Sequence, residues 1–222
     1  PPVSPADEIA ALNFGIGRIG EPTIDSPLPG VHFVDDDARV SYFTDMTTLA
    51  GLQARGVKLP GFVVAGPRRK IFHDPAWTRA AIVTCGGLCP GINDVIKGLV
   101  NTLHFSYGVD NVFGIRYGYR GLVPKYRLEP LPLDPDAVDT IHEKSGSILG
   151  TSRGEQDVEE MVRSLDRLNI GILFTIGGDG TQRGAHEIAR VACERGLSLS
   201  VIGIPKTIDN DLSFLDRTFG FE

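Results

Sequence analysis

The sequence predicts an α/β fold with a Rossmann-like, mostly parallel sheet and helices on both faces, preceded by a small N-terminal extension. Short apolar runs such as 80–84 and 170–176 have the length of buried strands. Segments with helical periodicity lie between the runs, and strands that alternate with helices form βαβ units. Several runs end in glycine- or aspartate-rich segments, where sheets of this class bind ligands.

Composition narrows the class of protein. Of the 222 residues, 41% are hydrophobic and 23% are charged, which is ordinary for a soluble globular protein. The net charge of −6 argues against a nucleic-acid partner, and no apolar run is long enough to span a membrane. Three cysteines do not make a disulfide framework in a chain of this length, so we expect a reducing, cytoplasmic location.

Residues 1–75 differ from the rest of the chain because prolines and glycines interrupt every period. A short helix is expected around 9–12. The runs 31–34 and 39–43 flank an acidic segment, 35–37, and predict a hairpin. We treat 1–75 as an N-terminal extension or small lobe without an assigned function.

From residue 76 the pattern is regular, and we assign 76–222 to one α/β domain. Asp134 followed by Pro135 is typical of a helix N-terminus. The expected strands are 80–84, 112–115, 170–176 and 199–204, and the expected helices are 90–103, 134–141, 155–168 and 181–192.

The segment Gly177-Gly178-Asp179-Gly180-Thr181 follows an apolar run and precedes a helical pattern. Glycines let the backbone approach a ligand closely, and amides at a helix N-terminus attract anionic oxygens. The Asp179 carboxylate would repel a bare phosphate, so it favours a hard cation such as Mg²⁺ that bridges it to a polyphosphate. The alternative is an Asp-Gly turn in which Thr181 caps the helix.

The segment 205–211 follows the last expected strand and holds Lys206, Thr207, Asp209 and Asp211. Two carboxylates beside a lysine suit proton abstraction from an alcohol near phosphates, because the cation neutralises charge on the transferring group. An Asx-rich turn with helix-capping aspartates is the alternative.

Two further segments have the chemistry of a phosphate site. The glycine-rich segment 86–93 turns a strand into a helix, and 147–154 sets Arg153 among small residues. Arginine is well suited to fix phosphoryl oxygens, although a plain turn and an exposed surface arginine are the alternatives. Since 86–91, 177–181 and 206–211 all follow expected strands, we expect them to converge on one crevice.

Five segments occur in a fixed order: Val83–Gly91, Gly114–Leu122, Gly150–Gly154, Ile176–Gly184 and Gly203–Asp211. Together they resemble the ATP-dependent phosphofructokinase family. The resemblance is nearest to the branch with kinetoplastid, plant and some bacterial enzymes that carry an N-terminal extension. It covers roughly residues 68–222.

The resemblance implies a role for each matching residue. Asp209 matches the base that deprotonates the 1-hydroxyl of fructose 6-phosphate, and Asp179 matches the carboxylate associated with Mg²⁺. Arg153 matches a residue that steadies the transferring phosphoryl group. Lys206 joins them as an expected catalytic residue. The ATP contacts implied are Gly86, Tyr117, Arg153, Gly154, Gly178, Asp179, Gly180 and Thr181, and the sugar-phosphate contacts are Thr207, Ile208 and Asp209.

Position 180 bears on the phosphoryl donor. Pyrophosphate-using members of the family typically carry aspartate there, whereas Gly180 leaves room for a nucleotide. Lys206 favours the opposite choice because lysine at that position is typical of pyrophosphate users. The named branch combines glycine with lysine, as this chain does, so ATP is expected and pyrophosphate is the alternative.

The sequence ends soon after Asp209, at Glu222. By resemblance the later sugar-phosphate-binding segments of the family are absent, so we expect half of an enzyme whose full-length form is a homotetramer. An inactive nucleotide-binding fragment or regulatory subunit is one alternative. An NAD or lipid kinase is another, since these share a loop like 177–181 but lack one like 206–211.

Overall fold

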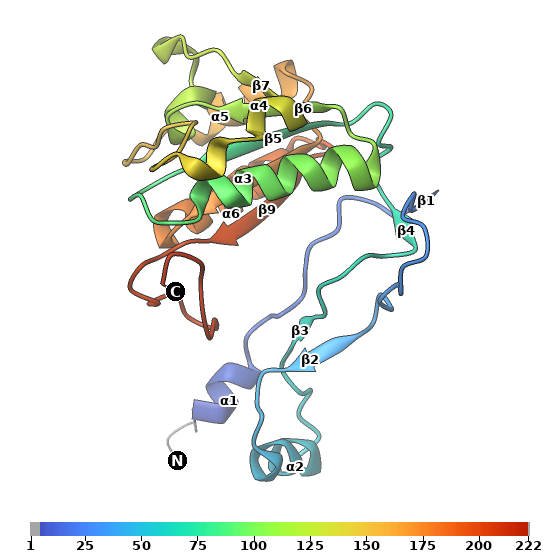
Figure 1. Cartoon of the computed structure of the whole chain (residues 1–222). Coiled ribbons are helices and arrows are strands. Elements are labelled where there is room, and N and C mark those ends of the chain that lie inside the picture. The colour runs from blue at the N-terminus through green and yellow to red at the C-terminus, as the bar shows by residue number, and fades with distance from the viewer. Residues whose placement is uncertain (1–4, 222) are drawn as a thin grey trace. The chain divides into compact units, whose positions relative to one another are not determined.

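A computed structural model describes residues 5–221 of the chain. The chain divides into two compact units, residues 1–72 and residues 73–222, and each is described by itself. Figure 1 shows the elements of both units along the chain. No helix within the described residues has the length and apolar character needed to cross a membrane.

The first unit contains short elements held by local pairing. Its helices are α1 (Pro5–Ala10) and α2 (Met46–Ala54), and its strands are β1 (Ile24–Asp25), β2 (Arg39–Ser41), β3 (Gly61–Val63) and β4 (Lys70–Ile71). β1 pairs antiparallel with β4, and β2 pairs antiparallel with β3. The expected short helix is present, although it begins earlier, at Pro5.

The expected hairpin of 31–34 with 39–43 is wrong. β2 pairs with β3 instead, with Val40 opposite Phe62, and the Val34 amide donates to the Pro67 carbonyl at 2.9 Å. The acidic segment does turn, since the Ala38 amide donates to the Asp35 carbonyl at 3.1 Å.

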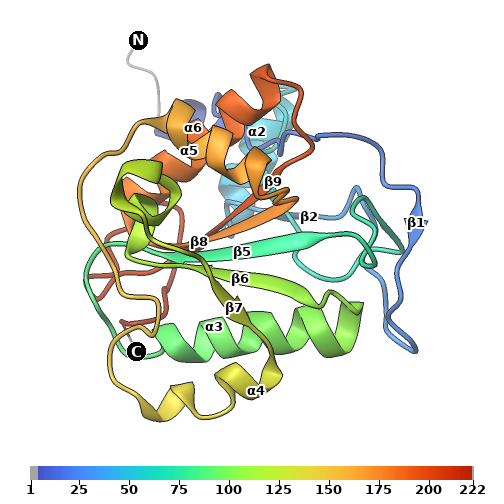
Figure 2. The same ribbon diagram turned by 90° about the horizontal axis from the view of Figure 1, so that it is seen from above.

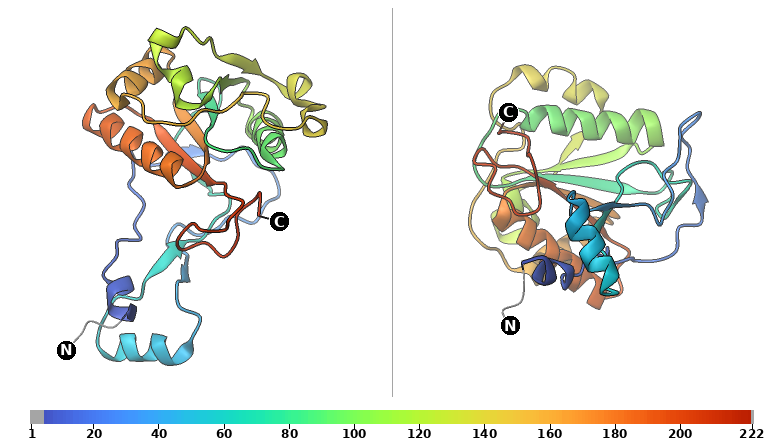
Figure 3. Two further views of the ribbon diagram at one scale, coloured as in Figure 1. Left: turned by 90° about the vertical axis from the view of Figure 1, so that its left-hand side faces the viewer. Right: turned by 90° about the horizontal axis from the view of Figure 1, so that it is seen from below.

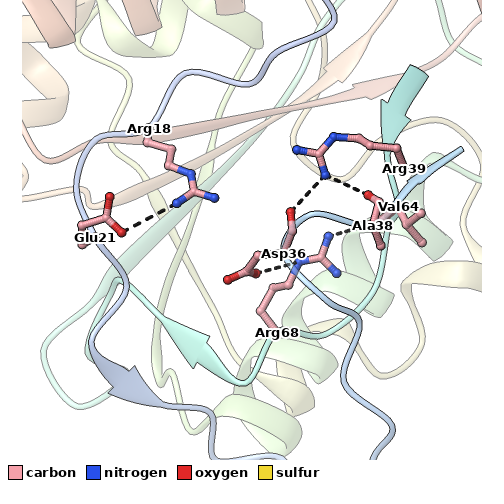
Figure 4. Close-up of polar contacts among 7 residues, drawn as sticks. All are labelled: Arg18, Glu21, Asp36, Ala38, Arg39, Val64 and Arg68. Carbon is pink, nitrogen blue, oxygen red and sulfur yellow. Dashed lines mark hydrogen bonds and ion pairs between the residues drawn. The ribbon is translucent and has the colours of Figure 1, made fainter. Parts of the chain in front are cut away.

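Charge explains where the acidic turn lies. Figure 4 shows the Arg68 guanidinium beside the Asp36 carboxylate, at 3.4 Å. Arg39 donates to the Asp36 carbonyl at 3.0 Å in the same view. The turn therefore docks on the segment after β3, and residues 31–34 have no strand partner across it.

In the described part of the second unit, residues 73–221, five strands form one sheet in the order β7-β6-β5-β8-β9. Neighbours are parallel except for β7, which is antiparallel to β6. The expected strands are confirmed within two residues. Their bounds are β5 (Arg79–Thr84), β6 (Asn111–Ile115), β8 (Ile172–Gly177) and β9 (Ser200–Pro205), and β7 (Leu131–Leu133) joins them without having been expected.

Helices cover both faces of this sheet, as the sequence predicts (Figure 2). The main helices are α3 (Ile92–Asn101), α4 (Pro135–Val138), α5 (Val158–Arg167) and α6 (Asp179–Glu194). Successive side chains of a strand point to opposite faces. In β5, Ala80 and Ile82 pack in the cluster with α3 and α4, whereas Ala81 and Val83 pack in the cluster with α5 and α6.

The helix ends follow local chemistry. The Asp134 carboxylate accepts from the Ala137 amide at 2.7 Å, and α4 ends after one turn, before a 3₁₀ turn at Ile141–Glu143. The Asp157 carboxylate caps α5 in the same way. The expected helix over 90–103 continues past α3 as a π-helical turn, Thr102–Tyr107.

Candidate active site

The loops that follow β5, β8 and β9 meet at the carboxyl edge of the sheet and line one cavity of about 780 Å³. Adjacent parallel strands bring their ends together: the Cys85 amide donates to the Ile176 carbonyl at 2.9 Å. The Lys206 amide donates to the Gly177 carbonyl at 3.0 Å. The expected convergence of 86–91, 177–181 and 206–211 is therefore confirmed.

The turn from β8 into α6 is built around Thr181. Its amide donates to the Gly178 carbonyl at 2.9 Å, and its side chain is buried against Gly177. The Tyr119 hydroxyl donates to the Thr181 carbonyl at 2.7 Å. At Gly180, by contrast, no heavy atom lies within 4 Å of the position that a Cβ would take. The turn is thus fixed on its inner side and open at residue 180.

Asp179 opens α6 and lines the cavity, with its side chain 61% exposed. Its carboxylate forms an ion pair with the Arg183 guanidinium, four residues on. Among the described residues no group of three or more His, Cys, Asp or Glu side chains could hold a metal ion. Mg²⁺ commonly takes one or two carboxylates together with water and substrate phosphates. The single carboxylate of Asp179 therefore fits a cation that binds together with a polyphosphate.

Lys206 joins the loop after β9 to the loop after β5. It is buried, and its ammonium group donates to the Gly87 carbonyl. The same ammonium lies 3.9 Å from the position of a Cβ on Gly86, a residue whose φ of 81° favours glycine. Burial raises the pKa of the neighbouring Cys85 thiol to about 11, against a smaller opposing effect of the Lys206 charge. The thiol is therefore protonated at neutral pH.

The loop after β9 presents the candidate base. The Thr207 hydroxyl accepts from the Asp209 amide at 3.1 Å and donates to the Asp211 carboxylate at 2.8 Å. Asn210 takes a left-handed φ of 50°, and its side-chain amide donates to the Asp216 carbonyl at 2.8 Å. Asp209 itself is exposed and lines the cavity together with Thr207, Ile208 and Asp211.

The loop returns along the 86–91 segment, as Figure 3 shows for the chain beyond β9 and the start of α3. Lys206 and Phe219 form an isolated bridge, and the Thr218 hydroxyl donates to the Thr207 carbonyl at 3.1 Å. A Cβ on Gly220 would lie 2.6 Å from the Cys89 sulfur. These contacts hold the backbone on either side of Asp209.

Arg153 reaches the cavity from the chain between α4 and α5. The Gly86 amide donates to the Ser152 carbonyl at 3.0 Å, which anchors this segment beside the loop after β5. The Arg153 guanidinium lies 3.4 Å from the position of a Cβ on Gly87. Arg153 is exposed and lines the cavity with Gly154.

Residues 79–222 match the sequence model of the family described as Phosphofructokinase. The chain belongs to this family.

Two relatives of the chain are both named ATP-dependent 6-phosphofructokinase. The chain is 43% identical over 218 residues to the ATP-dependent 6-phosphofructokinase of Borreliella burgdorferi, covering 95% of this chain and 48% of that protein. It is 55% identical over 159 residues to the ATP-dependent 6-phosphofructokinase of Trypanosoma cruzi, covering 72% of this chain and 33% of that protein. The chain thus spans less than half the length of these phosphofructokinases.

Solved phosphofructokinases share the fold. A pyrophosphate-dependent phosphofructokinase from Marinobacter aquaeolei superposes with a TM-score of 0.59 at 28% identity, covering 65% of this chain and 37% of that one. Phosphofructokinase from Saccharomyces cerevisiae gives a TM-score of 0.53 at 30% identity, covering 65% of this chain and 22% of that one. The predicted family and fold class are confirmed.

Two tyrosines of this phosphofructokinase segment differ in their exposure and in their relation to the cavity. Tyr117 has a left-handed φ of 54°, is 45% exposed, and lies against Gly150, outside the residues that line the cavity. Tyr119, which sequence reasoning missed, is buried and lines it. The chain turns after β6 because Tyr117 and Gly118 both take positive φ. No pattern in the sequence indicates which of the two tyrosine rings lines the cavity.

Other cavity residues were also missed by sequence reasoning. Arg183 and Glu187 follow Asp179 at helical spacing, which is a signal that could have found them. Val158 and Met161 lie on α5, whose apolar face indicates core packing rather than a ligand. Gly87, Leu88 and Asp211 also line the cavity and lie in the segments 86–91 and 206–211 that were expected to converge there; the further lining residues not expected from the sequence are Cys85, Ser152, Glu155, Gln156 and Gly184.

Proposed function

We propose that the chain supplies the nucleotide-binding and catalytic half of an ATP-dependent 6-phosphofructokinase, which phosphorylates fructose 6-phosphate to fructose 1,6-bisphosphate. One observation carries the proposal: the loops after three neighbouring parallel strands line a single cavity, and the carboxylate of Asp209 lines it together with Arg153 and Lys206. The names of the relatives, at 43% and 55% identity, support the same activity.

In the proposed reaction, the Asp209 carboxylate takes the proton of the sugar 1-hydroxyl. The hydroxyl oxygen then bonds to the γ-phosphorus of ATP, the bond from that phosphorus to the β–γ bridging oxygen breaks, and ADP leaves with the electron pair. Arg153 hydrogen-bonds the oxygens of the transferring group, and Lys206 adds positive charge beneath the loop. Mg²⁺, held through Asp179, would neutralise charge on the phosphates.

The cavity supports ATP rather than pyrophosphate as donor. Its volume of about 780 Å³ is larger than a pyrophosphate needs and falls in the usual range for small-molecule pockets. Val158 and Met161 form an apolar part of its wall, next to Tyr119, which suits a nucleobase and not a phosphate. The open space at Gly180 leaves room for the α-phosphate. Pyrophosphate remains the second candidate donor because Lys206 suits it.

We assign the sugar phosphate to Thr207, the Ile208 backbone and Asp209, and the nucleotide to Gly86, Arg153, Gly154 and residues 178–181. Tyr117 stays a prediction from the resemblance, and Tyr119 is the aromatic residue that the cavity geometry favours. Residues 1–75 remain an extension of unassigned function. We propose further that the catalytic protein is longer than this chain, is cytoplasmic and forms a homotetramer, and that this half alone does not turn over.

The test is a coupled assay of fructose 1,6-bisphosphate formation, run on this chain and on the longer protein that carries it. The longer protein is expected to form product with ATP and Mg²⁺ and to form little with pyrophosphate. Product formation with pyrophosphate alone would replace the donor assignment. No product with either donor, from protein that is folded, would overturn the activity.

A further inference from the structure

Arg183 lines the cavity, but the proposed phosphoryl transfer gives it no role. It lies four residues after Asp179 on α6, so the two side chains share one face of the helix. Its guanidinium forms an ion pair with the carboxylate expected to hold the metal. In this structure Arg183 therefore neutralises the Asp179 carboxylate, which we propose holds the metal.

The pair does not hold the helix in place. The side chains of Arg183 and Asp179 are 78% and 61% exposed, and exposed ion pairs contribute about 0–1 kcal/mol. α6 is anchored instead by the buried Ile188 and Val191 on its core-facing side. A contact this weak can be exchanged for another without unfolding the helix.

Arg190, on the same helix, offers a contrast. Its guanidinium pairs with Glu187 at 2.9 Å and with Glu194 at 2.6 Å, and it is absent from the residues that line the cavity. Arg190 is thus an arginine of α6 with carboxylate partners that does not itself line the cavity, although one of these partners, Glu187, does. Arg190→Met therefore tests whether the loss of any ion-paired arginine of this helix has the effect expected for Arg183. It serves as a matched control for Arg183.

We propose that Arg183 is an exchange partner of Asp179: it pairs with the carboxylate in the free protein and transfers to the phosphate oxygens when a metal–nucleotide complex binds. The inference rests on the proposed nucleotide function. A guanidinium makes strong hydrogen bonds to phosphate, and its departure frees the carboxylate for the shell of the cation. Metal alone must displace Arg183 without compensation, so metal and nucleotide favour each other's binding by the same factor.

The experiment measures binding of Mn²⁺ alone and of Mn²⁺ with ATP to the 222-residue chain, by water-proton relaxation and calorimetry. Asp179→Asn identifies the metal signal that belongs to this site. Arg183→Met is expected to bind Mn²⁺ alone about threefold tighter, as expected for a lost exposed ion pair. It should bind Mn²⁺ with ATP about tenfold more weakly, because a charge-assisted hydrogen bond to phosphate is lost. Arg183→Lys should recover most of the ATP affinity, and Arg190→Met should match the wild type.

Opposite changes in the two affinities support the exchange. Unchanged affinities, or a loss of both, would overturn it, the latter by showing that the pair has a structural role. Thermal unfolding of each variant checks that it is folded. If the wild type binds no ATP at all, the proposed nucleotide function fails, while the comparison with Mn²⁺ alone still tests whether Arg183 restrains Asp179.

Discussion

The two edges of the central sheet differ in what their polar groups contact. At the amino edge, a pocket of about 320 Å³ is lined in part by residues that hydrogen-bond within the protein: His73 Nε2 lies 2.9 Å from the Ser200 hydroxyl. The Thr78 hydroxyl donates to the Asp74 carbonyl there at 2.6 Å. At the carboxyl edge, Asp209 and Arg153 are exposed to a cavity more than twice as large.

The same strands supply both edges, so the difference comes from the loops. At the amino edge, several polar side chains hydrogen-bond to nearby groups, and the exposed Arg79 donates to the Leu168 carbonyl at 3.2 Å. The carboxyl-edge loops use glycine to bring the backbone close to the cavity, and Lys206 to join neighbouring loops. The carboxyl edge is the better candidate for chemistry because charged groups from several loops, among them Asp209 and Arg153, line one cavity in the size range of ligand pockets.

The largest expected effect is on turnover, from Asp209→Asn. Removing a general base should lower kcat by about 10²–10⁴-fold in the longer catalytic protein. ATP affinity, measured by calorimetry, should stay within about twofold, since the base acts on the sugar hydroxyl. Ser200→Ala at the amino edge is the control and should leave kcat unchanged. A similar loss of kcat in both variants would contradict the claim that catalysis takes place at the carboxyl edge and not at the amino edge.

The next effect is on donor choice, from Gly180→Asp. A carboxylate in the open space beside the phosphates should weaken ATP binding about tenfold to a hundredfold, as expected for like charges a few ångströms apart near a protein surface. The matched control is Gly98→Asp, which also adds a carboxylate at an exposed helical glycine with open space around it. Equal ATP affinities for the two variants would refute the placement of the phosphates at residue 180.

A smaller effect is expected from Tyr119→Phe. The variant loses the hydroxyl that donates to the Thr181 carbonyl, and one such hydrogen bond contributes about 0.5–1.5 kcal/mol. Urea unfolding should show a loss of that size, with weaker ATP binding as the turn loosens. Tyr117→Phe changes an exposed ring outside the cavity and should have neither effect. The opposite pattern would assign the nucleotide to Tyr117.

The smallest effect belongs to the amino edge. Burial lowers the pKa of His73 from 6.5, so below that pH the unfolded chain takes up the proton more readily than the folded chain. Stability is therefore lost as pH falls from 6.5 through the folded pKa, and the loss is small because the ring is only partly buried. Urea unfolding at pH 7.5 and 5.5 should show a smaller difference in His73→Gln than in the wild type. An unchanged difference would exclude His73 as its source.

The strands of the sheet could be predicted because burial dictates their composition. β5 and β8 are mainly apolar runs of strand length; β8 ends at Gly177, β5 ends at Thr84 shortly before Gly86-Gly87, and β9 ends at Pro205. β7 escaped prediction because three residues with a proline carry no periodicity, and it pairs only through its register with β6. The hairpin at 31–43 was wrong because β2 has its partner across α2, a contact that local sequence does not encode.

In the candidate site, too, some features could be predicted from local sequence and others could not. The meeting of the glycine- and aspartate-rich loops was predictable, since each follows an expected strand and the carboxyl ends of parallel strands lie at one edge of the sheet. Tyr119 and Met161 were not, because a ring or thioether at a core position has the same sequence pattern whether or not a cavity adjoins it. Arg183 could have been found by its spacing from Asp179.

The central claim is that the carboxyl-edge cavity binds a metal–nucleotide complex in preference to metal–pyrophosphate. Calorimetric titration of the 222-residue chain with ATP, and separately with pyrophosphate, both in excess Mg²⁺, tests it most directly. We predict binding of ATP that excess pyrophosphate displaces only weakly, and loss of that binding in Gly180→Asp. Tighter binding of pyrophosphate than of ATP, with no effect of Gly180→Asp, would contradict the account.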